Sequence, residues 1–429
     1  MPLSADSLAL HGGIPLRQDP WPSWPRSDAE TERLVLEVLR SGRWAISEMS
    51  NGLELFERRF AKAFAAYHEV PHCIPTTSGT SALTIAFEAL GLSRGAEVLV
   101  PGMTWVACAS AVAGAGLVPV LVDIDPQTLC MSPAAAEAAI TKATEAVLLV
   151  HYTGNTADIG AFEKLSARYK LAVVEDCAQA HGAMYADRPV GSYGDIATFS
   201  MQDSKVLTSG EGGACLTRDA ELADRMEQYR ADGRRYSRGP VGLGAPDLED
   251  RGDVQGRNLC LSEIQAAVLL GRLQRLDEEN RHRQEMATVL DGLLAGFAGV
   301  SGLVPDPRMT RRTYYRYCLR LDPALFQPVE VEEIREELSA ELQLTLEPLH
   351  DPLNDCTLYN PMGSPRKYDP ALLPKLDPRN FDLPAARQAR QQFLTLPHRV
   401  LLGDQEDMRC IATALEKVLS QRRSWSVPG

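Results

Sequence analysis

The chain of 429 residues has no run of the roughly 18 uncharged apolar residues that a membrane-spanning helix needs. Its first residues, MPLSADSLALHGG, also lack the basic segment followed by an apolar stretch that marks a secretory signal peptide. The remaining composition, with 45% hydrophobic and 24% charged residues, is typical of a globular protein in water. We therefore expect a cytoplasmic protein with no membrane partner.

Positive charge and paired cysteines are also scarce. Lys and Arg number 44 against 57 Asp and Glu, and the formal net charge of −13 predicts a surface that repels nucleic acid. The nine cysteines are scattered, the closest pair in sequence is Cys108 and Cys130, and no C-x-x-C occurs. We therefore expect free thiols in a reducing compartment, no nucleic-acid partner and no metal site.

Between residues 72 and 217, short apolar segments alternate with segments of helical pattern. Several of the apolar segments are apolar at almost every position, which is typical of strands buried on both faces of a mainly parallel sheet. The sequence therefore predicts an α/β fold with a seven-stranded sheet. The predicted strands are residues 72–76, 97–101, 119–124, 146–151, 171–176, 196–200 and 213–217.

A chain of this length is expected to form a large domain and a smaller one. Residues 1–30 are rich in Pro and Trp and predict an extended N-terminal arm. The helical pattern that follows begins near Asp28 and ends at Gly42, as helices often end at glycine. We place the large domain at residues 31–268, and a bridging helix with a small C-terminal domain at residues 269–429.

The C-terminal part has the pattern of an α+β domain. One long helical pattern at 261–297 predicts the bridging helix, and an apolar segment at 315–322 predicts a strand. Further helices are predicted at 330–342 and 405–423. Residues 350–385 contain many Pro, Asn and Asp, and predict a long loop.

Ligands of α/β sheets bind beyond the carboxyl ends of the strands, so residues that follow predicted strands are the candidates for a site. Residues 77–81, TSGTS, follow the first strand and open a helix. Small residues there let free backbone N–H groups approach a phosphate, although such a run can also be a simple helix cap. The sequence contains no GxxxxGK[ST] loop and no GxGxxG after a strand, so a nucleotide-binding loop of those kinds is not predicted.

An acid and a lysine follow two later strands. Asp176 ends the apolar segment LAVVED, where a buried carboxylate needs a cation such as a protonated pyridine nitrogen, unless it only caps the next turn. Lys205 lies in the loop MQDSKVLTSGEGG after IATFS, where burial would lower the pKa of its ammonium group. Taken alone, Lys205 is typical of a solvated lysine and His181 of a core histidine. Residues 77–81, Asp176 and Lys205 each lie at or after the end of a predicted strand. Together they predict one shared cofactor site.

The segments TSGTSAL, EDCAQAHGA, FSMQDSKVLTSGEGG and GRNLCLSEIQAA together resemble the DegT/DnrJ/EryC1/StrS family of sugar aminotransferases, which have fold type I. The resemblance extends from about residue 30 to the C-terminus. Within the family, GRWAIS, CIPTTSGTSALTIAFEALG and VLVPGMTWVACASAV are most similar to the L-glutamine:scyllo-inosose and 2-deoxy-scyllo-inosose aminotransferases of aminoglycoside biosynthesis. The resemblance implies the fold of pyridoxal 5′-phosphate (PLP)-dependent transferases, with a mainly parallel seven-stranded sheet and a small α+β domain.

The resemblance implies a role for each residue around the PLP ring. Lys205 would hold PLP as a Schiff base and later move the proton, and Asp176 would pair with the pyridine nitrogen. Gln179 would lie near the ring hydroxyl and Trp105 would stack on the ring face, although Trp105 could also be a core aromatic. His181 would support the catalytic site from beside the cofactor.

The resemblance also implies how the phosphate is held. Gly79, Thr80 and Ser200 would bind it from the same chain. Asn258 matches the position that reaches the phosphate from the neighbouring subunit, so a homodimer with shared active sites is implied. Ser200 and Asn258 could instead be local caps.

The reaction that we expect is a ping-pong transamination from L-glutamine or L-glutamate to a keto group on a polyhydroxylated six-membered ring. The acceptor is either a free keto-cyclitol or a nucleotide-linked keto-sugar, and a diphosphate would need cations. A cluster with the sequence YRADGRRYSRG could supply them or could be a solvated surface: Arg230, Arg234, Arg235 and Arg238. Two other functions remain open, a PLP-dependent dehydratase or aminohydroxybenzoate-synthase-like enzyme, and a cofactor-binding partner protein without turnover.

Overall fold

The computed structural model describes residues 7–422. Its main sheet has seven strands in the order β1-β9-β8-β5-β4-β2-β3. The pairs from β8 to β3 are parallel, whereas β9 runs antiparallel to both β1 and β8. The seven predicted strands are confirmed, four with the predicted ends and three within two residues of them. The strands are β1 His72–Thr76, β2 Glu97–Pro101, β3 Val118–Val122, β4 Thr144–Val150, β5 Ala172–Asp176, β8 Ile196–Ser200 and β9 Gly213–Thr217.

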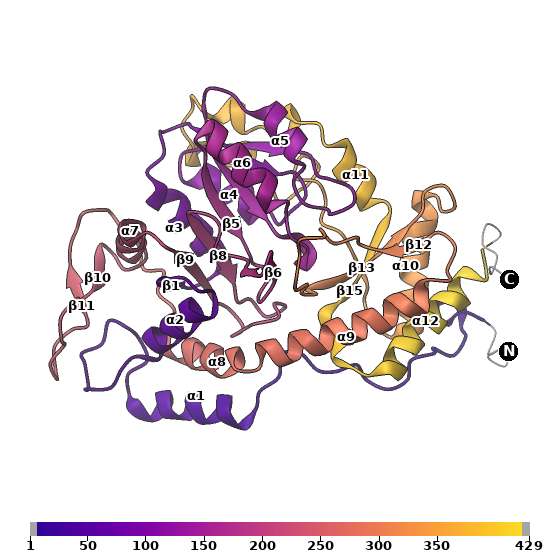
Figure 1. Cartoon of the computed structure of the whole chain (residues 1–429), viewed down its shortest axis with the longest axis horizontal. Coiled ribbons are helices and arrows are strands. Elements are labelled where there is room, and N and C mark those ends of the chain that lie inside the picture. The colour runs from indigo at the N-terminus through magenta and orange to yellow at the C-terminus, as the bar shows by residue number, and fades with distance from the viewer. Residues whose placement is uncertain (1–6, 423–429) are drawn as a thin grey trace.

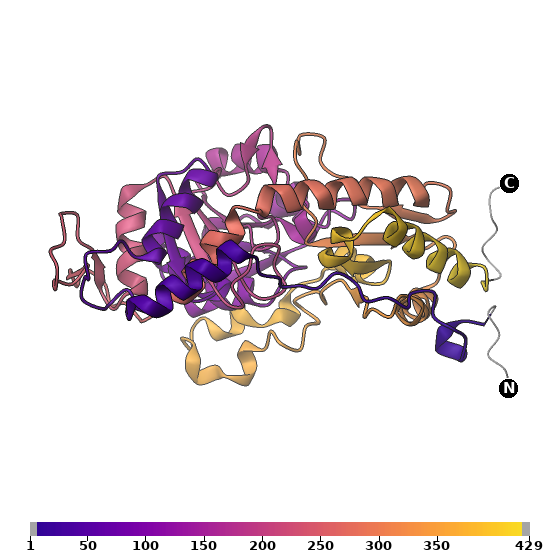
Figure 2. The ribbon, with the colours of Figure 1, turned by 90° about the horizontal axis from the view of Figure 1, so that it is seen from below.

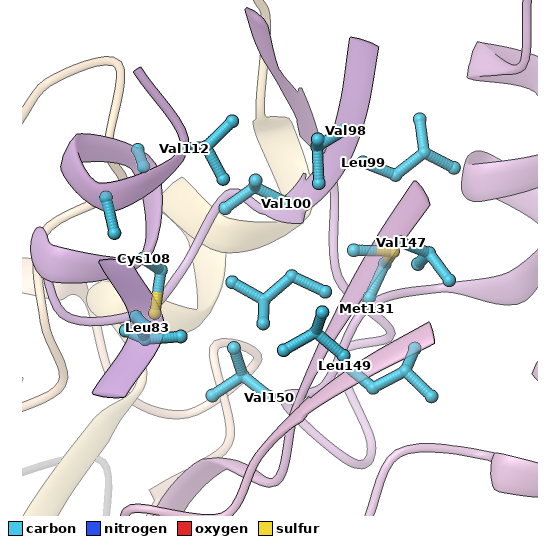
Figure 3. Close-up of a cluster of buried hydrophobic side chains, with 14 of the residues drawn as sticks. Leu83, Val98, Leu99, Val100, Cys108, Val112, Met131, Val147, Leu149 and Val150 are labelled. Carbon is cyan, nitrogen blue, oxygen red and sulfur yellow. The ribbon is translucent and has the colours of Figure 1, made fainter. Parts of the chain in front are cut away.

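Helices cover both faces of this sheet. Because side chains of a strand alternate between its faces, neighbouring residues are buried in two different cores. Ile196 and Cys215 are buried with side chains of α3 and α4, whereas Phe199 and Leu216 are buried with side chains of α1, α2 and α8. Figure 3 shows the first core, in which Leu83 of α3 and residues of α4 face the valines of β2 and β4. The helices of this part are α1 Ala29–Ser41, α2 Phe56–Tyr67, α3 Gly79–Leu90, α4 Ala107–Gly114, α5 Pro133–Ala139, α6 Ile159–Tyr169, α7 Ala220–Arg230 and α8 Glu263–Leu273.

The predicted ends of the first helix are confirmed. The Asp28 carboxylate accepts the backbone N–H of Thr31 at 2.8 Å, which satisfies a free donor of the first turn. Gly42 ends the helix with φ of 67°, a left-handed conformation that glycine adopts without strain.

The long helix predicted at 261–297 is wrong in one respect, because two helices form there. They are α8 and α9 (Leu276–Leu294), and they separate at Gln274 and Arg275. The buried apolar residues of α8 belong to a core of the main sheet, and those of α9 from Met286 onward belong to the C-terminal core. The helical spacing of apolar residues continues across the break because both helices bury an apolar face. Figure 1 shows α9 running from α8 to the C-terminal part.

The C-terminal part contains a four-stranded antiparallel sheet in the order β12-β13-β15-β14. The predicted strand at 315–322 is confirmed as β13, and helices form at 328–342 and 405–419. The elements of this part are β12 Val300–Gly302, β13 Arg316–Leu321, α10 Pro328–Leu342, β14 Glu347–Pro348, β15 Phe393–Pro397, η7 His398–Leu402 and α12 Gln405–Leu419.

The predicted arm lies along this C-terminal part (Figure 2). Leu8 and Trp21 are buried in its core, and the Trp21 indole Nε1–H donates to the carbonyl oxygen of Leu342 at 2.7 Å. Residues 1–6 of the arm and residue 423 of the last predicted helix lie outside the described residues. The domain boundaries at 30 and 268 remain predictions.

The segment predicted as a long loop packs back onto the main sheet. Leu353, Tyr359 and Leu383 are buried in the same core as β2 and β4, and the Asp123 carboxylate accepts backbone N–H groups at the start of α11 (Pro384–Arg390). The segment forms short 3-10 turns: η3 Pro361–Gly363, η4 Pro365–Lys367, η5 Leu373–Leu376 and η6 Pro378–Asn380.

Several short elements complete the described chain. They are η1 Ala9–His11, η2 Tyr152–Gly154, and two hairpins, β6 Met184–Tyr185 with β7 Arg188–Pro189 and β10 Arg234–Tyr236 with β11 Leu248–Asp250. Over residues 7–422, no helix has the length and apolar character that crossing a membrane requires.

Candidate active site

A cavity of about 450 Å³ lies at the carboxyl ends of the central strands, within the range of small-molecule sites. It is lined from the main sheet, from the loop after β8, and from β13 and β14 of the C-terminal part. Seven of the nine residues predicted from the sequence line this one cavity: Gly79, Thr80, Trp105, Asp176, Gln179, Ser200 and Lys205.

One end of the cavity is formed by the start of α3 against the end of β8. Ser78 caps α3 by accepting the N–H of Ser81 at 3.1 Å. A Cβ placed on Gly79 would lie 2.6 Å from the Cβ of Ser200, so only glycine allows the helix start to approach the strand so closely. The free N–H groups of the first turn and the hydroxyls of Thr80 and Ser200 form a cup whose chemistry fits a phosphate.

Asp176 ends β5 and is only 6% exposed. Its carboxylate accepts the N–H of Ala178 at 3.0 Å and the thiol hydrogen of Cys108 at 3.2 Å. Burial raises the pKa of the Cys108 thiol well above its ordinary value, and the charge of Asp176 raises it further, so Cys108 stays a protonated donor. The sequence analysis missed Cys108, since its contact with Asp176 joins α4 to β5.

The end of β5 is also held by a buried network around Glu175, the residue before Asp176. Its carboxylate accepts three backbone N–H groups from residues 191–194, at 2.7–3.0 Å. His151 accepts the N–H of Ala157 at Nδ1, so its Nε2 carries the hydrogen and donates to Glu175 at 3.2 Å. His151, Glu175 and Cys177 have the spacing of metal ligands, but these hydrogen bonds already use the carboxylate and both ring nitrogens. The network fixes the strand that carries Asp176.

Gln179 and Trp105 complete the walls of the cavity around the ring site. The Gln179 Oε1 accepts the N–H of Thr153 at 2.7 Å, which leaves its amide N–H₂ group to donate to a ligand. Thr153 has φ of 59° within η2, and this conformation turns its N–H toward Gln179. Trp105 is 51% exposed on the cavity wall, with its ring centroid 5.6 Å from that of His350, so it is not a core aromatic.

Lys205 lies in the loop after β8, where its N–H donates to the carbonyl oxygen of Gln202 at 2.8 Å. Its Nζ is 4.3 Å from the ring centroid of Tyr315, the residue just before β13. Burial alone would raise the pKa of Tyr315, but the charges of Lys205 and Arg316 lower it overall. The Tyr315 hydroxyl is 3.0 Å from Ser204 Oγ, so Tyr315 ties the lysine loop to the C-terminal sheet.

Two predicted residues do not line the cavity. His181 is fully buried behind it, with its ring centroid 5.4 Å from that of Phe199. Burial, reinforced by the charge of Lys205, lowers the pKa of His181 to about 3, so its ring is neutral. Asn258 is exposed on this chain, where its Oδ1 accepts the N–H of Cys260 at 3.5 Å. The roles of His181 and Asn258 remain predictions.

The sequence matches the DegT/DnrJ/EryC1/StrS aminotransferase family over residues 25–416. The L-glutamine:2-deoxy-scyllo-inosose aminotransferase of Micromonospora echinospora is 47% identical over 417 residues, which cover 97% of this chain and 98% of that relative. The L-glutamine:scyllo-inosose aminotransferase of Streptomyces griseus is 45% identical over 98% of this chain and 99% of its own length.

The fold is also that of known enzymes. The crystal structure of 3-amino-5-hydroxybenzoic acid synthase superposes with a TM-score of 0.80 at 29% identity, over 95% of this chain and all of that one. The family match spans the main sheet, the cavity and most of the C-terminal part. The phosphate cup, the buried aspartate and the loop lysine are the groups that PLP requires. The chain therefore belongs to the DegT/DnrJ/EryC1/StrS aminotransferase family and is a PLP-dependent aminotransferase.

Proposed function

We propose that this enzyme transfers the amino group of L-glutamine to the keto group of a scyllo-inosose-type cyclitol, as in the biosynthesis of aminocyclitol antibiotics. The observation that carries the proposal is the identity of 45–47% with the two glutamine:(2-deoxy-)scyllo-inosose aminotransferases over nearly the whole of each chain. The matched stretches cover 97–98% of this chain, so they include the elements that line the cavity.

PLP, when bound, supplies an electron sink that makes the bonds to the substrate α-carbon labile. The cup formed by Gly79, Thr80 and Ser200 holds its phosphate, and Trp105 covers one face of its ring. Asp176 pairs with the ring nitrogen, and the donors Cys108 and Ala178 keep the carboxylate oriented toward it. All of these residues line the one cavity, which supports the proposed roles.

Three further side chains complete the catalytic set. The amide N–H₂ group of Gln179 donates toward the ring hydroxyl, since its oxygen already accepts from Thr153. Lys205 Nζ removes the proton from the α-carbon of the amino donor and, in the second half-reaction, delivers a proton to the former keto carbon of the acceptor. His181, neutral and buried, supports the wall of the cavity through its contact with Phe199.

The distribution of cations favours a free cyclitol over a nucleotide-linked sugar. A diphosphate needs unpaired cations, which the arginine cluster could have supplied if it were not simply a solvated surface. Arg230 is 1% exposed and paired with Glu57, so the prediction of a solvated surface is wrong for this residue. The other three arginines of the cluster bind carboxylates of Asp224, Asp232 and Glu249: Arg234, Arg235 and Arg238. None of the four lines the cavity as the structure describes it.

The two rival functions predict different chemistry. A synthase of the aminohydroxybenzoate type would release water from its substrate without transferring an amino group from L-glutamine to a ketone. The likeness to that synthase is 29% in sequence, well below the 47% shared with an aminotransferase. A cofactor-binding partner protein without turnover would bind PLP, but its cofactor absorbance would not change when an amino donor is added.

We further propose a cytoplasmic homodimer in which Asn258 reaches the phosphate of the other subunit. The exposed position of Asn258 on the single chain supports this arrangement, because a residue that serves a neighbouring active site must project outward. All nine cysteines are free, as expected in a reducing compartment.

An acceptor screen tests the proposed reaction. The purified enzyme with PLP is incubated with L-glutamine and either scyllo-inosose, 2-deoxy-scyllo-inosose or a nucleotide-linked keto-sugar, and products are identified by mass. We expect an aminocyclitol to form and the nucleotide sugar to be unchanged. Amination of the nucleotide sugar alone, or loss of water without amino transfer, would refute the proposal.

A further inference from the structure

One guanidinium lines the cavity among the described residues, and it lies on a strand outside the elements assigned to the cofactor. Arg316, the first residue of β13, lies beside Tyr315, with its guanidinium carbon 5.5 Å from the ring centroid. Lys205 Nζ lies 4.3 Å from the same centroid. The phosphate cup lies at the start of α3 and the end of β8, and Asp176 lies at the end of β5, so Arg316 belongs to the substrate side of the site.

Arg316 is paired with Glu347 of β14, the edge strand of the C-terminal sheet. The two residues lie on strands that flank β15, where Arg316 is opposite Pro397 and Glu347 is opposite Thr395. Pro397 and Thr395 are two residues apart, so both side chains project from the same face of the sheet. The sheet therefore holds the pair together at the mouth of the cavity.

The pair is asymmetric in its exposure. The Arg316 side chain is 18% exposed, whereas that of Glu347 is 55% exposed at a sheet edge. Ion pairs with one solvated partner contribute little to stability, so the carboxylate can be exchanged at small cost.

The two substrates of the proposed reaction differ in charge. An amino donor carries an α-carboxylate next to the amine that must reach Lys205, whereas a keto-cyclitol is a neutral polyol. A guanidinium binds a carboxylate through two parallel N–H···O bonds, and a paired arginine and glutamate can donate to and accept from hydroxyl groups. The cavity must accommodate both molecules in turn.

We infer that Arg316 binds the α-carboxylate of the amino donor, which displaces Glu347, and that the Arg316–Glu347 pair re-forms when the neutral acceptor occupies the site. The inference rests on the proposed function, because it requires a ping-pong exchange between an amino acid and an uncharged ketone. Arg316 is thus a specificity-determining residue for the donor, and Glu347 is its exchangeable counter-ion. The exchange explains how one cavity serves both substrates without a fixed unpaired charge.

The test measures the two half-reactions separately in the PLP-loaded enzyme. Bleaching of the cofactor absorbance reports the reaction with L-glutamine, and the return of the absorbance reports amination of scyllo-inosose. For Arg316→Gln we expect the glutamine concentration for half-maximal bleaching to rise by about 10- to 100-fold, the worth of a lost charge-assisted pair. We expect the acceptor half-reaction to fall by a smaller factor.

A matched variant and a truncated donor isolate the carboxylate. Arg320→Gln changes an arginine of the same strand outside the cavity and should behave as wild type. Arg316→Lys keeps the charge without the planar fork and should show an intermediate loss. The donor 4-aminobutanamide, which is glutamine without its α-carboxylate, should react poorly with wild type and about as well as glutamine with Arg316→Gln.

A second readout does not depend on turnover. Binding of 5-amino-5-oxopentanoate, which is glutamine without its amino group, should weaken in Arg316→Gln by the same factor, measured by calorimetry. Equal bleaching of Arg316→Gln and Arg320→Gln by glutamine, or an unchanged preference for glutamine over 4-aminobutanamide, would overturn the inference. If wild type itself is not bleached by glutamine or does not aminate the ketone, the proposed function fails instead.

Discussion

The close approach of α3 to β8 predicts an unusual response to Gly79→Ala. In an ordinary helix this substitution stabilises a protein by up to about 1 kcal/mol, since alanine is the better helix former. At Gly79 the new Cβ would lie 2.6 Å from the Cβ of Ser200 and 3.1 Å from its Cα. Overpacking of this kind costs about 1–3 kcal/mol, so the clash outweighs the gain and we expect net destabilisation of about 1–2 kcal/mol.

Two comparisons separate the clash from other effects. Gly292 lies on the exposed face of α9, where an added Cβ meets nothing within 4 Å, so Gly292→Ala should stabilise by about 0.5–1 kcal/mol. The double variant Gly79→Ala/Ser200→Gly removes the nearest atom of the clash and should be less destabilised than the sum of its two single variants. Ser200→Ala keeps that Cβ, so it should not rescue Gly79→Ala.

The assay is urea unfolding of the cofactor-free variants at one protein concentration, which measures packing apart from phosphate binding. A parallel titration with PLP should show weaker binding for Gly79→Ala, because the helix start must move away from Ser200. If Gly79→Ala is stabilised as much as Gly292→Ala, the argument for a tightly packed phosphate cup is wrong.

Two further predictions concern catalysis and pH. Lys205→Ala should abolish amino transfer and the covalent link to PLP while the unfolding free energy changes little, because the residue lies in a partly exposed loop; wild-type turnover in this variant would contradict its assigned role. Burial raises the pKa of Glu263 to about 7, although its carboxylate accepts backbone N–H groups of Phe56 and Glu57. The native state then binds a proton that the unfolded state releases between about pH 4.5 and pH 7, so this group costs stability as the pH rises, by about 3 kcal/mol in all. Glu263→Gln should flatten the fall in unfolding free energy between pH 5 and pH 8, and an unchanged pH profile would show that Glu263 does not titrate there.

The main sheet could be predicted from the sequence because its strands are apolar at nearly every position. Such segments are buried on both faces wherever they lie, so their pattern survives without knowledge of neighbours. The prediction failed at residues 274–275, where the apolar spacing of one helix continues into the next. The spacing reports that a face is buried but not which core buries it, so a change of core within a helical pattern leaves no local signal.

Residues 350–385 show a second limit. Their Pro and Asn content correctly predicted the absence of long regular elements, but not that Leu353 and Leu383 would enter the core of the main sheet. Contacts of this kind join segments more than two hundred residues apart, as in the bonds from α11 to Asp123. Sequence periodicity describes one segment at a time and does not select its partner.

The sequence by itself determined the cofactor end of the site, since Asp176 ends β5, Ser200 ends β8 and Lys205 follows β8, and the ends of neighbouring parallel strands meet at one edge. Only the tertiary structure decided the substrate end. Arg316 and Glu347 belong to strands of a separate sheet, and their place over the cavity depends on how the C-terminal part packs against the main sheet. That packing comes from long-range burial, which local residue order does not specify.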